Sequence, residues 1–260
     1  KTPAECAKLF KGVTGHSQGL LGATILASAT TEDNLVQMTL SAVKFMVWFG
    51  ARLQQATPFS LEVRAEVRAE AKQLGYPLPT PMLAVLHLDV QRLTKYVGMV
   101  NKAVTSSPER QLQIGLRNAP KINIVVGHPE SLFQLVTILH RAEMAPKSNL
   151  DQNRVPYSQR KKEFACRFLN VSVPFHSSLL SPVVAAILSD ADRLGFSLNP
   201  KSIAIPIYGS DGPSVDATKP EPKDLRAIQP EHFLRDLIQL QCVSVVDWVH
   251  TLLPVSLALA

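Results

Sequence analysis

Val13-Thr14-Gly15-His16-Ser17-Gln18-Gly19-Leu20, near the start of a sequence of 260 residues, indicates both a class of fold and a chemistry. The centre of this stretch fits G-x-S-x-G, in which a serine stands at the apex of a sharp turn from a strand into a helix. We therefore predict an α/β fold with Ser17 as a nucleophile. The backbone N–H of Gln18, at the start of the helix, would donate to an oxyanion. We expect glycine at positions 15 and 19 because larger side chains would collide across the turn.

A nucleophilic serine needs a base, and the sequence contains seven histidines. His176 is the candidate, because it lies after a predicted strand and Pro174 and before a predicted helix. The ends of strands are where α/β folds often carry catalytic groups. His16 adjoins the nucleophile, and we expect its side chain to point away from Ser17. A purely structural role is the alternative for His176, as it is for His140 in a predicted helix.

The remaining elements divide at a proline-rich break, residues 77–81. After the break we predict, in order, a strand at Met82–Leu86, a helix at Asp89–Asn101, strands at Gln111–Leu116 and Ile122–Val126, a helix at Glu130–Ala142 and a strand at Arg167–Val173. This β-α-β-β-α-β order is that of a ferredoxin-like unit. Elsewhere we predict helices at Asp33–Gln55, Leu61–Leu74, Ser177–Leu194, Pro230–Leu240 and Val243–Leu253, and a strand at Ile203–Tyr208. Residues 81–173 are therefore assigned to an insert, and residues 1–80 and 174–260 to the core.

The composition excludes several classes of protein. Hydrophobic residues make up 46% and charged residues 18%, which is typical of a globular domain and excludes global disorder. No apolar run reaches the ~18 residues of a membrane helix, and no signal-peptide pattern follows Lys1, so we expect a cytoplasmic domain and no membrane partner. The net charge of +6 is scattered, which argues against nucleic acid as a partner. The three cysteines are not in metal-ligand spacing, and we expect no metal.

Three stretches of the sequence resemble the acyltransferase domain of fungal type I synthases. They are residues 13–20 as quoted above, Asn149-Leu150-Asp151-Gln152-Asn153-Arg154-Val155-Pro156-Tyr157-Ser158-Gln159-Arg160-Lys161, and Arg167-Phe168-Leu169-Asn170-Val171-Ser172-Val173-Pro174-Phe175-His176-Ser177. The resemblance implies an α/β-hydrolase-like acyltransferase core with an inserted ferredoxin-like subdomain. It also implies that Ser17 accepts the acyl group and that His176 is the base, held mainly by a backbone carbonyl rather than by a carboxylate. Only 16 residues precede Ser17, and they lack the family's Gly-Gln-Gly oxyanion loop, so we expect a domain truncated at its N-terminus.

The acyl group is expected to be uncharged. Malonyl-selective members of the family carry an arginine at the position matched by Phe49, where it pairs with the free carboxylate of the substrate. Phe49 would leave that carboxylate desolvated and unpaired. Core packing of Phe49 is compatible with this interpretation, and Arg52 is expected to face outward. A cluster formed by Arg154, Arg160 and Lys161 is either a solvated loop or a binding site for an acidic carrier protein or the phosphates of coenzyme A.

The resemblance therefore implies a ping-pong acyltransferase of fungal polyketide or fatty acid synthesis. It would move an uncharged starter unit from coenzyme A or a carrier protein, through an acyl-serine, to the phosphopantetheine thiol of an acyl carrier protein. No bound cofactor is expected, and the partners would be the carrier protein and the other domains of the parent synthase. The starter-unit domain of a non-reducing polyketide synthase is favoured over the acetyltransferase domain of the fatty acid synthase β subunit. A serine thioesterase and a non-catalytic docking domain are the alternative classes.

Overall fold

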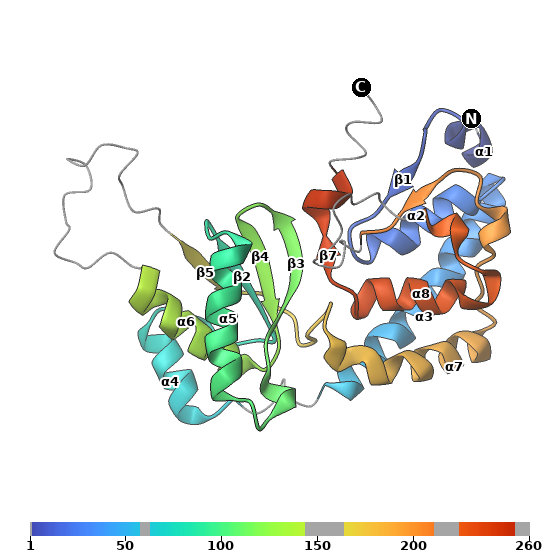
Figure 1. The fold of residues 1–260 in the computed structure, drawn as a ribbon. Coiled ribbons are helices and arrows are strands. Elements are labelled where there is room, and N and C mark those ends of the chain that lie inside the picture. Colours follow the sequence, from blue (N-terminus) through green and yellow to red (C-terminus); the bar gives the residue numbers. More distant parts are fainter. Residues whose placement is uncertain (1, 58–62, 144–163, 211–223, 253–260) are drawn as a thin grey trace, which may run out of the picture. The chain divides into compact units, whose positions relative to one another are not determined.

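The computed structural model describes residues 2–57, 63–143, 164–210 and 224–252 (Figure 1). The chain forms two units. The first unit combines two parts of the sequence, Lys1–Pro58 and Phe175–Ala260, and the second unit is the continuous stretch Phe59–Pro174. The second unit therefore begins before the proline-rich break at which the sequence analysis placed the boundary.

Helix α4 (Ala65–Gln73) explains this difference in the boundary. Its residue Ala71 is buried in the apolar core of the second unit, and Val67 packs against the same core. Arg64, directly before the helix, donates hydrogen bonds from its backbone N–H and its Nε to the carboxylate of Glu130 in the second unit. Residues 63–80, assigned to the core from the sequence, thus lie with the second unit because their apolar and charged partners are there.

The first unit consists of helices around two short parallel strands. Strand β1 (Val13–Thr14) pairs with β6 (Ile207–Tyr208), and the Thr14 hydroxyl donates to the Tyr208 carbonyl at 2.8 Å. The helices are α1 (Pro3–Ala7), α2 (Gly19–Ser28), α3 (Glu32–Ala56), α7 (Val184–Leu194) and α8 (Pro230–Cys242). The strand predicted at Ile203–Tyr208 is shorter than expected, because a 3₁₀ turn at Pro200–Ser202 leads into it. Helix α2 follows β1 after a four-residue turn, as the pattern at residues 15–19 predicts.

Helix α3 buries one face and pairs with α7. Phe45 and Phe49 are buried on that face, and the Phe45 ring stacks on Phe196 with 4.5 Å between ring centroids. Arg52 does not simply face outward, as the sequence suggested. Its Nε and Nη2 donate to the two carboxylate oxygens of Asp190, a buried residue of α7, at 2.5 and 3.1 Å. The guanidinium therefore joins the two helices.

The second unit contains a mixed sequence of strands and helices. Their order is β2 (Met82–Leu86), α5 (Val90–Ala103), β3 (Gln113–Ala119), β4 (Ile122–Val126), α6 (Pro129–Glu143) and β5 (Ala165–Phe168). The four strands lie side by side in the order β5-β2-β4-β3, and each neighbouring pair is antiparallel. Strand β5 begins and ends earlier in the sequence than the predicted Arg167–Val173. Directly after it, the N–H of Leu169 donates one further backbone hydrogen bond to the carbonyl of Met82.

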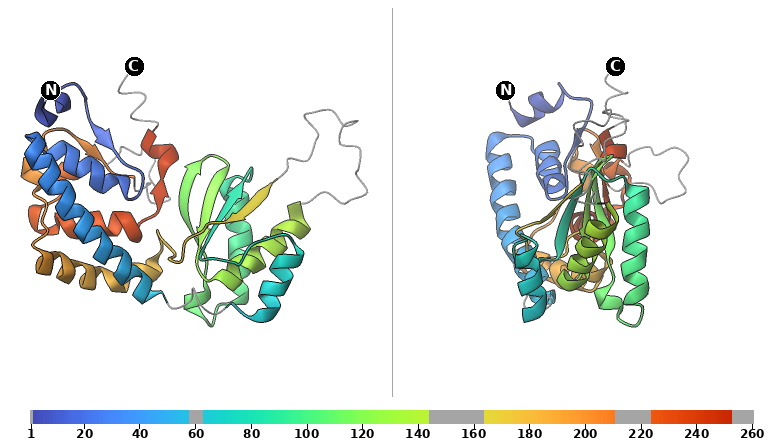
Figure 2. Two further views of the ribbon diagram at one scale, coloured as in Figure 1. Left: turned by 180° about the vertical axis from the view of Figure 1, so that it is seen from behind. Right: turned by 90° about the vertical axis from the view of Figure 1, so that its left-hand side faces the viewer.

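Helices α5 and α6 cover one face of this sheet (Figures 1 and 2). Alternation along the strands decides which residues face them, because successive side chains of a strand point to opposite faces. Leu83 and Val85 of β2 and Val125 of β4 belong to the same apolar cluster as Leu93 and Leu135 of the two helices. Within this unit the core thus lies between the helices and one side of the strands.

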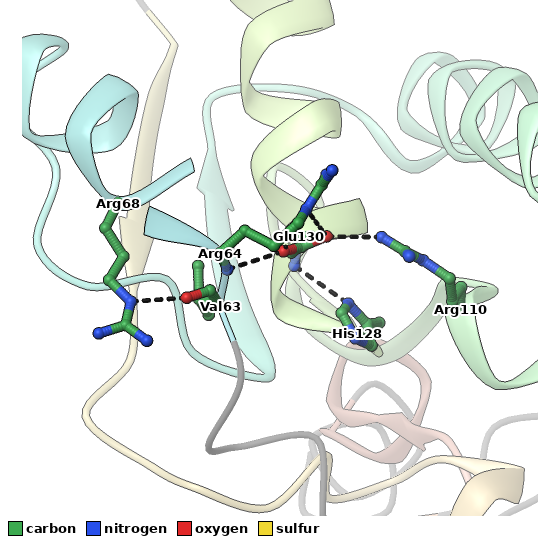
Figure 3. A network of polar contacts seen from close by, with 6 residues as sticks. All are labelled: Val63, Arg64, Arg68, Arg110, His128 and Glu130. Atoms are coloured by element: carbon green, nitrogen blue, oxygen red, sulfur yellow. Dashed lines mark hydrogen bonds and ion pairs between the residues drawn. The ribbon is translucent and has the colours of Figure 1, made fainter. Parts of the chain in front are cut away.

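A buried carboxylate ties the start of α6 to its surroundings (Figure 3). Glu130 accepts hydrogen bonds from the N–H and Nε of Arg64 at 2.9 and 3.0 Å and from Nη2 of Arg110 at 2.7 Å. Its own N–H donates to Nδ1 of His128 at 3.2 Å. Burial raises the pKa of the Glu130 carboxyl, but the hydrogen bonds from Arg64 and Arg110 outweigh burial and lower the pKa to about 2. Glu130 is therefore ionised across the physiological range.

Two of the helices predicted from the sequence differ in the structure. The helix predicted at Val243–Leu253 is interrupted, because Val246–Asp247 form the short strand β7 and only residues 248–252 are helical. The helix predicted at Ser177–Leu194 begins with a 3₁₀ segment, Ser178–Val183, which contains Pro182.

Within the described parts of the chain, no helix combines the length and the apolar character needed to cross a membrane.

Candidate active site

A sharp turn joins β1 to α2 and carries Ser17 at its apex. Ser17 has a φ of 54°, in the left-handed region that side chains other than glycine rarely adopt. A Cβ added at Gly15 would lie 2.1 Å from the carbonyl carbon of Gly19, so only glycine fits at position 15. A Cβ at Gly19 would meet no atom within 4 Å, and the expectation that both glycines are sterically required is wrong for Gly19. The strained turn matches the pattern of a nucleophile elbow.

The first turn of α2 leaves one backbone donor available. The N–H groups of Gly19, Leu20 and Leu21 donate to the carbonyls of residues 16, 17 and 18 at 2.9–3.2 Å. Among the described residues, no such acceptor is found for the N–H of Gln18, the residue that precedes the helix. The N-terminus of a helix also carries partial positive charge. The Gln18 N–H is therefore a donor that can stabilise negative charge next to Ser17.

Ser17 and His176 are brought together although they lie 159 positions apart in the sequence. The Ser17 Oγ and the His176 Nε2 are 2.8 Å apart, which is hydrogen-bond distance. His176 is only 1% exposed and also has a left-handed backbone, with a φ of 62°. It lies between the end of β5 and the 3₁₀ segment Ser178–Val183. Two of the three non-glycine residues with positive φ in the described ranges thus form one hydrogen-bonded pair.

Two backbone carbonyls hold His176. Its N–H donates to the carbonyl of Cys242 at 2.7 Å, and its Nδ1 lies 2.8 Å from the carbonyl of Ser244. A carbonyl oxygen only accepts hydrogen bonds, so Nδ1 carries the hydrogen, and Nε2 is left as the acceptor for the Ser17 hydroxyl. The histidine is therefore oriented as a base toward Ser17 without a carboxylate partner.

The environment of His176 favours its neutral form. Burial lowers the pKa of the imidazole, hydrogen bonding to Ser244 opposes this effect, and His16 adds a further lowering, with a resulting pKa of about 4. At neutral pH the imidazole is therefore neutral, and its Nε2 can accept a proton. The ring of His16 packs edge-on against Trp248, with 5.2 Å between centroids.

The other residues predicted from the sequence have different outcomes. Phe49 is 1% exposed, and its ring centroid lies 6.0 Å from that of Phe45, so it is a core residue of α3, and its role in selectivity stays a prediction. Arg154, Arg160 and Lys161 lie outside the described residues. No group of three or more metal-ligating side chains occurs in the described ranges. No side-chain pattern points to Cys242 and Ser244, because they act through carbonyls that every residue has.

Comparison with known families identifies the chain more closely. The family described as "Starter unit:ACP transacylase in aflatoxin biosynthesis" matches residues 5–161, more than half of the chain. The fatty acid synthase subunit beta of Saccharomyces cerevisiae is 35% identical over 214 residues, which cover 81% of this chain and 10% of the yeast protein. The subunit beta of Schizosaccharomyces pombe is 34% identical over 247 residues, 95% of this chain and 11% of that protein. The chain thus spans about a tenth of these relatives.

Solved structures share the fold at low sequence identity. The malonyl CoA-acyl carrier protein transacylase of Coxiella burnetii matches with a TM-score of 0.62 and 16% identity, over 98% of this chain and 62% of that chain. A malonyl-transacylase solved with a type II polyketide synthase acyl-carrier protein matches with a TM-score of 0.60 and 15% identity, over 98% and 63% of the two chains. The fold is therefore the mixed α/β fold of these transacylases. With residues 5–161 matched by its profile, the chain belongs to the starter unit:ACP transacylase family of acyltransferases.

Proposed function

We propose that this chain is an acyltransferase domain that loads an acyl starter unit onto an acyl carrier protein, with Ser17 as nucleophile and His176 as base. The observation that carries the proposal is the 2.8 Å contact between Ser17 Oγ and His176 Nε2 at a left-handed elbow. A partly exposed serine paired with a neutral histidine is the arrangement that covalent acyl transfer needs. The family to which the chain belongs supports the same reaction.

The mechanism follows from the positions of the polar atoms. As Ser17 Oγ attacks the thioester carbonyl carbon, its proton passes to His176 Nε2, and the carbonyl oxygen becomes an oxyanion facing the Gln18 N–H. The Ser244 carbonyl stabilises the imidazolium through the Nδ1 hydrogen. When the C–S bond breaks, His176 returns the proton to the departing thiolate. The same steps in reverse, with the phosphopantetheine thiol of the carrier protein as nucleophile, release the acyl group.

The substrate in this proposal is an uncharged acyl thioester, of coenzyme A or of a carrier protein, and no cofactor stays bound. Phe49 supports the neutral acyl group, because a free carboxylate buried beside an aromatic ring would have no partner. The solved complex of a related fold with an acyl-carrier protein supports a carrier protein as partner. We assign contact with the carrier or with coenzyme A phosphates to the basic residues Arg154, Arg160 and Lys161.

The architecture in this proposal is an α/β-hydrolase-like core with a ferredoxin-like insert. The strand order β5-β2-β4-β3, with α5 and α6 as the two connecting helices, supports the ferredoxin-like assignment of the second unit. The parent would be a fungal multifunctional synthase. The starter-unit description of the family supports a polyketide synthase, and the two yeast relatives support a fatty acid synthase β subunit as the second candidate.

Intact-mass measurement after incubation with acyl-CoA tests the proposal. The wild-type chain should gain one acyl group at Ser17 and pass it to a holo carrier protein. Ser17→Ala should abolish labelling, and His176→Ala should slow it by a factor on the order of 10² to 10⁴. Rapid release of free acid would indicate a thioesterase. Labelling that persists in Ser17→Ala, or no labelling of the wild type in the context of its parent synthase, would refute the proposal.

A further inference from the structure

The contacts that orient the serine–histidine pair converge on one short stretch, residues 242–250, called here the anchor segment. The carbonyls of Cys242 and Ser244 hold the backbone and the ring of His176. Six residues after Cys242, Trp248 packs its ring against His16, the residue before the nucleophile. The anchor segment thus touches both sides of the pair, and its path decides where the Nδ1 acceptor lies.

The Ser244 carbonyl lies between two points at which the anchor segment is fixed. On one side, the N–H groups of Val243 and Ser244 both donate to the carbonyl of Gln239 at 2.8 Å, which ends helix α8. On the other side, the N–H of Asp247 donates to the carbonyl of Ser210 at 2.8 Å. Ser210 follows β6 by two residues, so this bond joins the anchor segment to the strand that pairs with β1.

Asp247 is the centre of this second fixed point. It is 2% exposed, and its Oδ1 accepts the backbone N–H of His250 at 3.2 Å while its Oδ2 lies 2.7 Å from Nδ1 of the same histidine. The Asp247 carbonyl accepts the hydroxyl of Thr251 at 2.8 Å. Asp247 therefore caps the helical residues 248–252, and the side chain of His250 reinforces this cap through its contact with Oδ2. The proposed mechanism uses neither Asp247 nor His250.

We propose that Asp247 is a positioning residue for His176, because it fixes the anchor segment and thereby holds the Ser244 carbonyl at the distance that keeps hydrogen on Nδ1. This inference rests on the proposed function. Without the Asp247 carboxylate, its two contacts with His250 are lost, while the backbone bond to Ser210 remains. The start of the helical residues 248–252 is then less firmly held, and the carbonyl three residues before Asp247 can shift. Small displacements of a catalytic group cost large rate factors, on the order of 10² for about 1 Å. A histidine whose Nδ1 lacks its acceptor can also populate the opposite tautomer, in which Nε2 carries the hydrogen and cannot accept the Ser17 proton.

The test compares Asp247→Ala with Asp247→Asn and with a matched control, Asp89→Ala. Asp89 caps α5 in the second unit through the same kind of contact, to the N–H of Arg92 at 2.8 Å. Two quantities are measured for each folded variant. One is the single-turnover rate of Ser17 acylation at saturating acyl-CoA, and the other is the tautomer of His176 from nitrogen-15 NMR of the ring. The NMR measurement needs no substrate.

Asp247→Ala should lower the acylation rate at saturating acyl-CoA at least tenfold, and His176 should show a mixture of tautomers. Asp247→Asn keeps an oxygen for the His250 N–H and should stay within about threefold of the wild type, as should Asp89→Ala. If Asp247→Ala does not fold, His250→Ala should show the same two effects in weaker form. A wild-type rate and an unchanged tautomer in Asp247→Ala, or in His250→Ala where that variant replaces it, would overturn the positioning role. Absence of acyl-Ser17 in the wild type within its parent synthase would instead refute the proposed function, while the tautomer measurement still tests Asp247.

Discussion

Replacing Glu130 by glutamine should weaken the second unit, and the loss should depend on pH. The carboxylate is 5% exposed and accepts hydrogen bonds from Arg64 and Arg110. A carboxyl whose pKa falls from 4.5 in the unfolded chain to about 2 in the folded chain contributes about 3 kcal/mol at pH 7, since one pKa unit corresponds to about 1.4 kcal/mol. Arg64 is 67% exposed, so solvent screening makes this an upper value.

The sign of the pH dependence follows from the lowered pKa. The contribution of Glu130 is fully present above about pH 4.5 and disappears as the pH falls toward 2, with about 1.4 kcal/mol left at pH 3. The difference in unfolding free energy between the wild type and Glu130→Gln should therefore be larger at pH 7 than at pH 3, by up to about 2 kcal/mol. The control Glu109→Gln removes an exposed carboxylate nearby and should change stability by less than about 0.5 kcal/mol.

The measurement has to report on the second unit alone. Both tryptophans, Trp48 and Trp248, belong to the first unit, so their fluorescence does not follow the loss. Cys166 lies on β5, and burial raises the pKa of its thiol to about 12. Opening of the second unit can be followed by labelling Cys166 with a disulfide reagent that works in acid. The labelling is quantified by mass spectrometry during urea unfolding at both pH values. An equal stability difference at pH 3 and pH 7 would refute the electrostatic account of Glu130.

Three other predictions concern the candidate active site. Because burial gives His176 a pKa of about 4, the rate of Ser17 acylation should stay level from about pH 5.5 to 8 and fall below pH 5; a midpoint near 6.5 would contradict this. Gly15→Ala should reduce acyl labelling at least a hundredfold or prevent folding, since its Cβ would overlap the next turn, whereas Gly19→Ala should be tolerated; equal labelling of the two variants would remove the steric argument. Phe49→Arg should shift competitive loading from acetyl- and hexanoyl-CoA toward malonyl-CoA by at least tenfold, and a wild type that already prefers malonyl would disprove the neutral-substrate prediction.

Local patterns in the sequence were enough to predict the elements that depend on neighbouring residues. Strands Met82–Leu86 and Ile122–Val126 have the predicted limits, because each is a short apolar run with a turn on either side. The capping box of α1 is local in the same way, because Thr2 and Glu5 lie only three positions apart. The elbow could be recognised because the strain at Ser17 limits which residues can surround it.

Several other features that depend on distant partners were not predicted. Helix α4 carries alternating charges that indicate a solvated face, and only the buried Glu130 and the core around Ala71 assign it to the second unit. Arg52 was expected to face solvent, because the sequence does not show that Asp190 lies buried opposite it. The family resemblance implied that a backbone carbonyl holds His176, as the structure shows, but no side-chain pattern identifies Cys242 and Ser244 as the acceptors.

The discontinuous first unit has a consequence for the order of events during synthesis. Ser17 and His176 lie 159 positions apart in the sequence, and most of the residues between them belong to the second unit. At roughly 5–20 residues per second, a ribosome makes the serine about 8–30 seconds before the histidine. The second unit is continuous and can fold during that interval, since domains generally fold as units. During that interval Ser17 has no base. The serine therefore stays unactivated until the C-terminal part of the first unit leaves the ribosome.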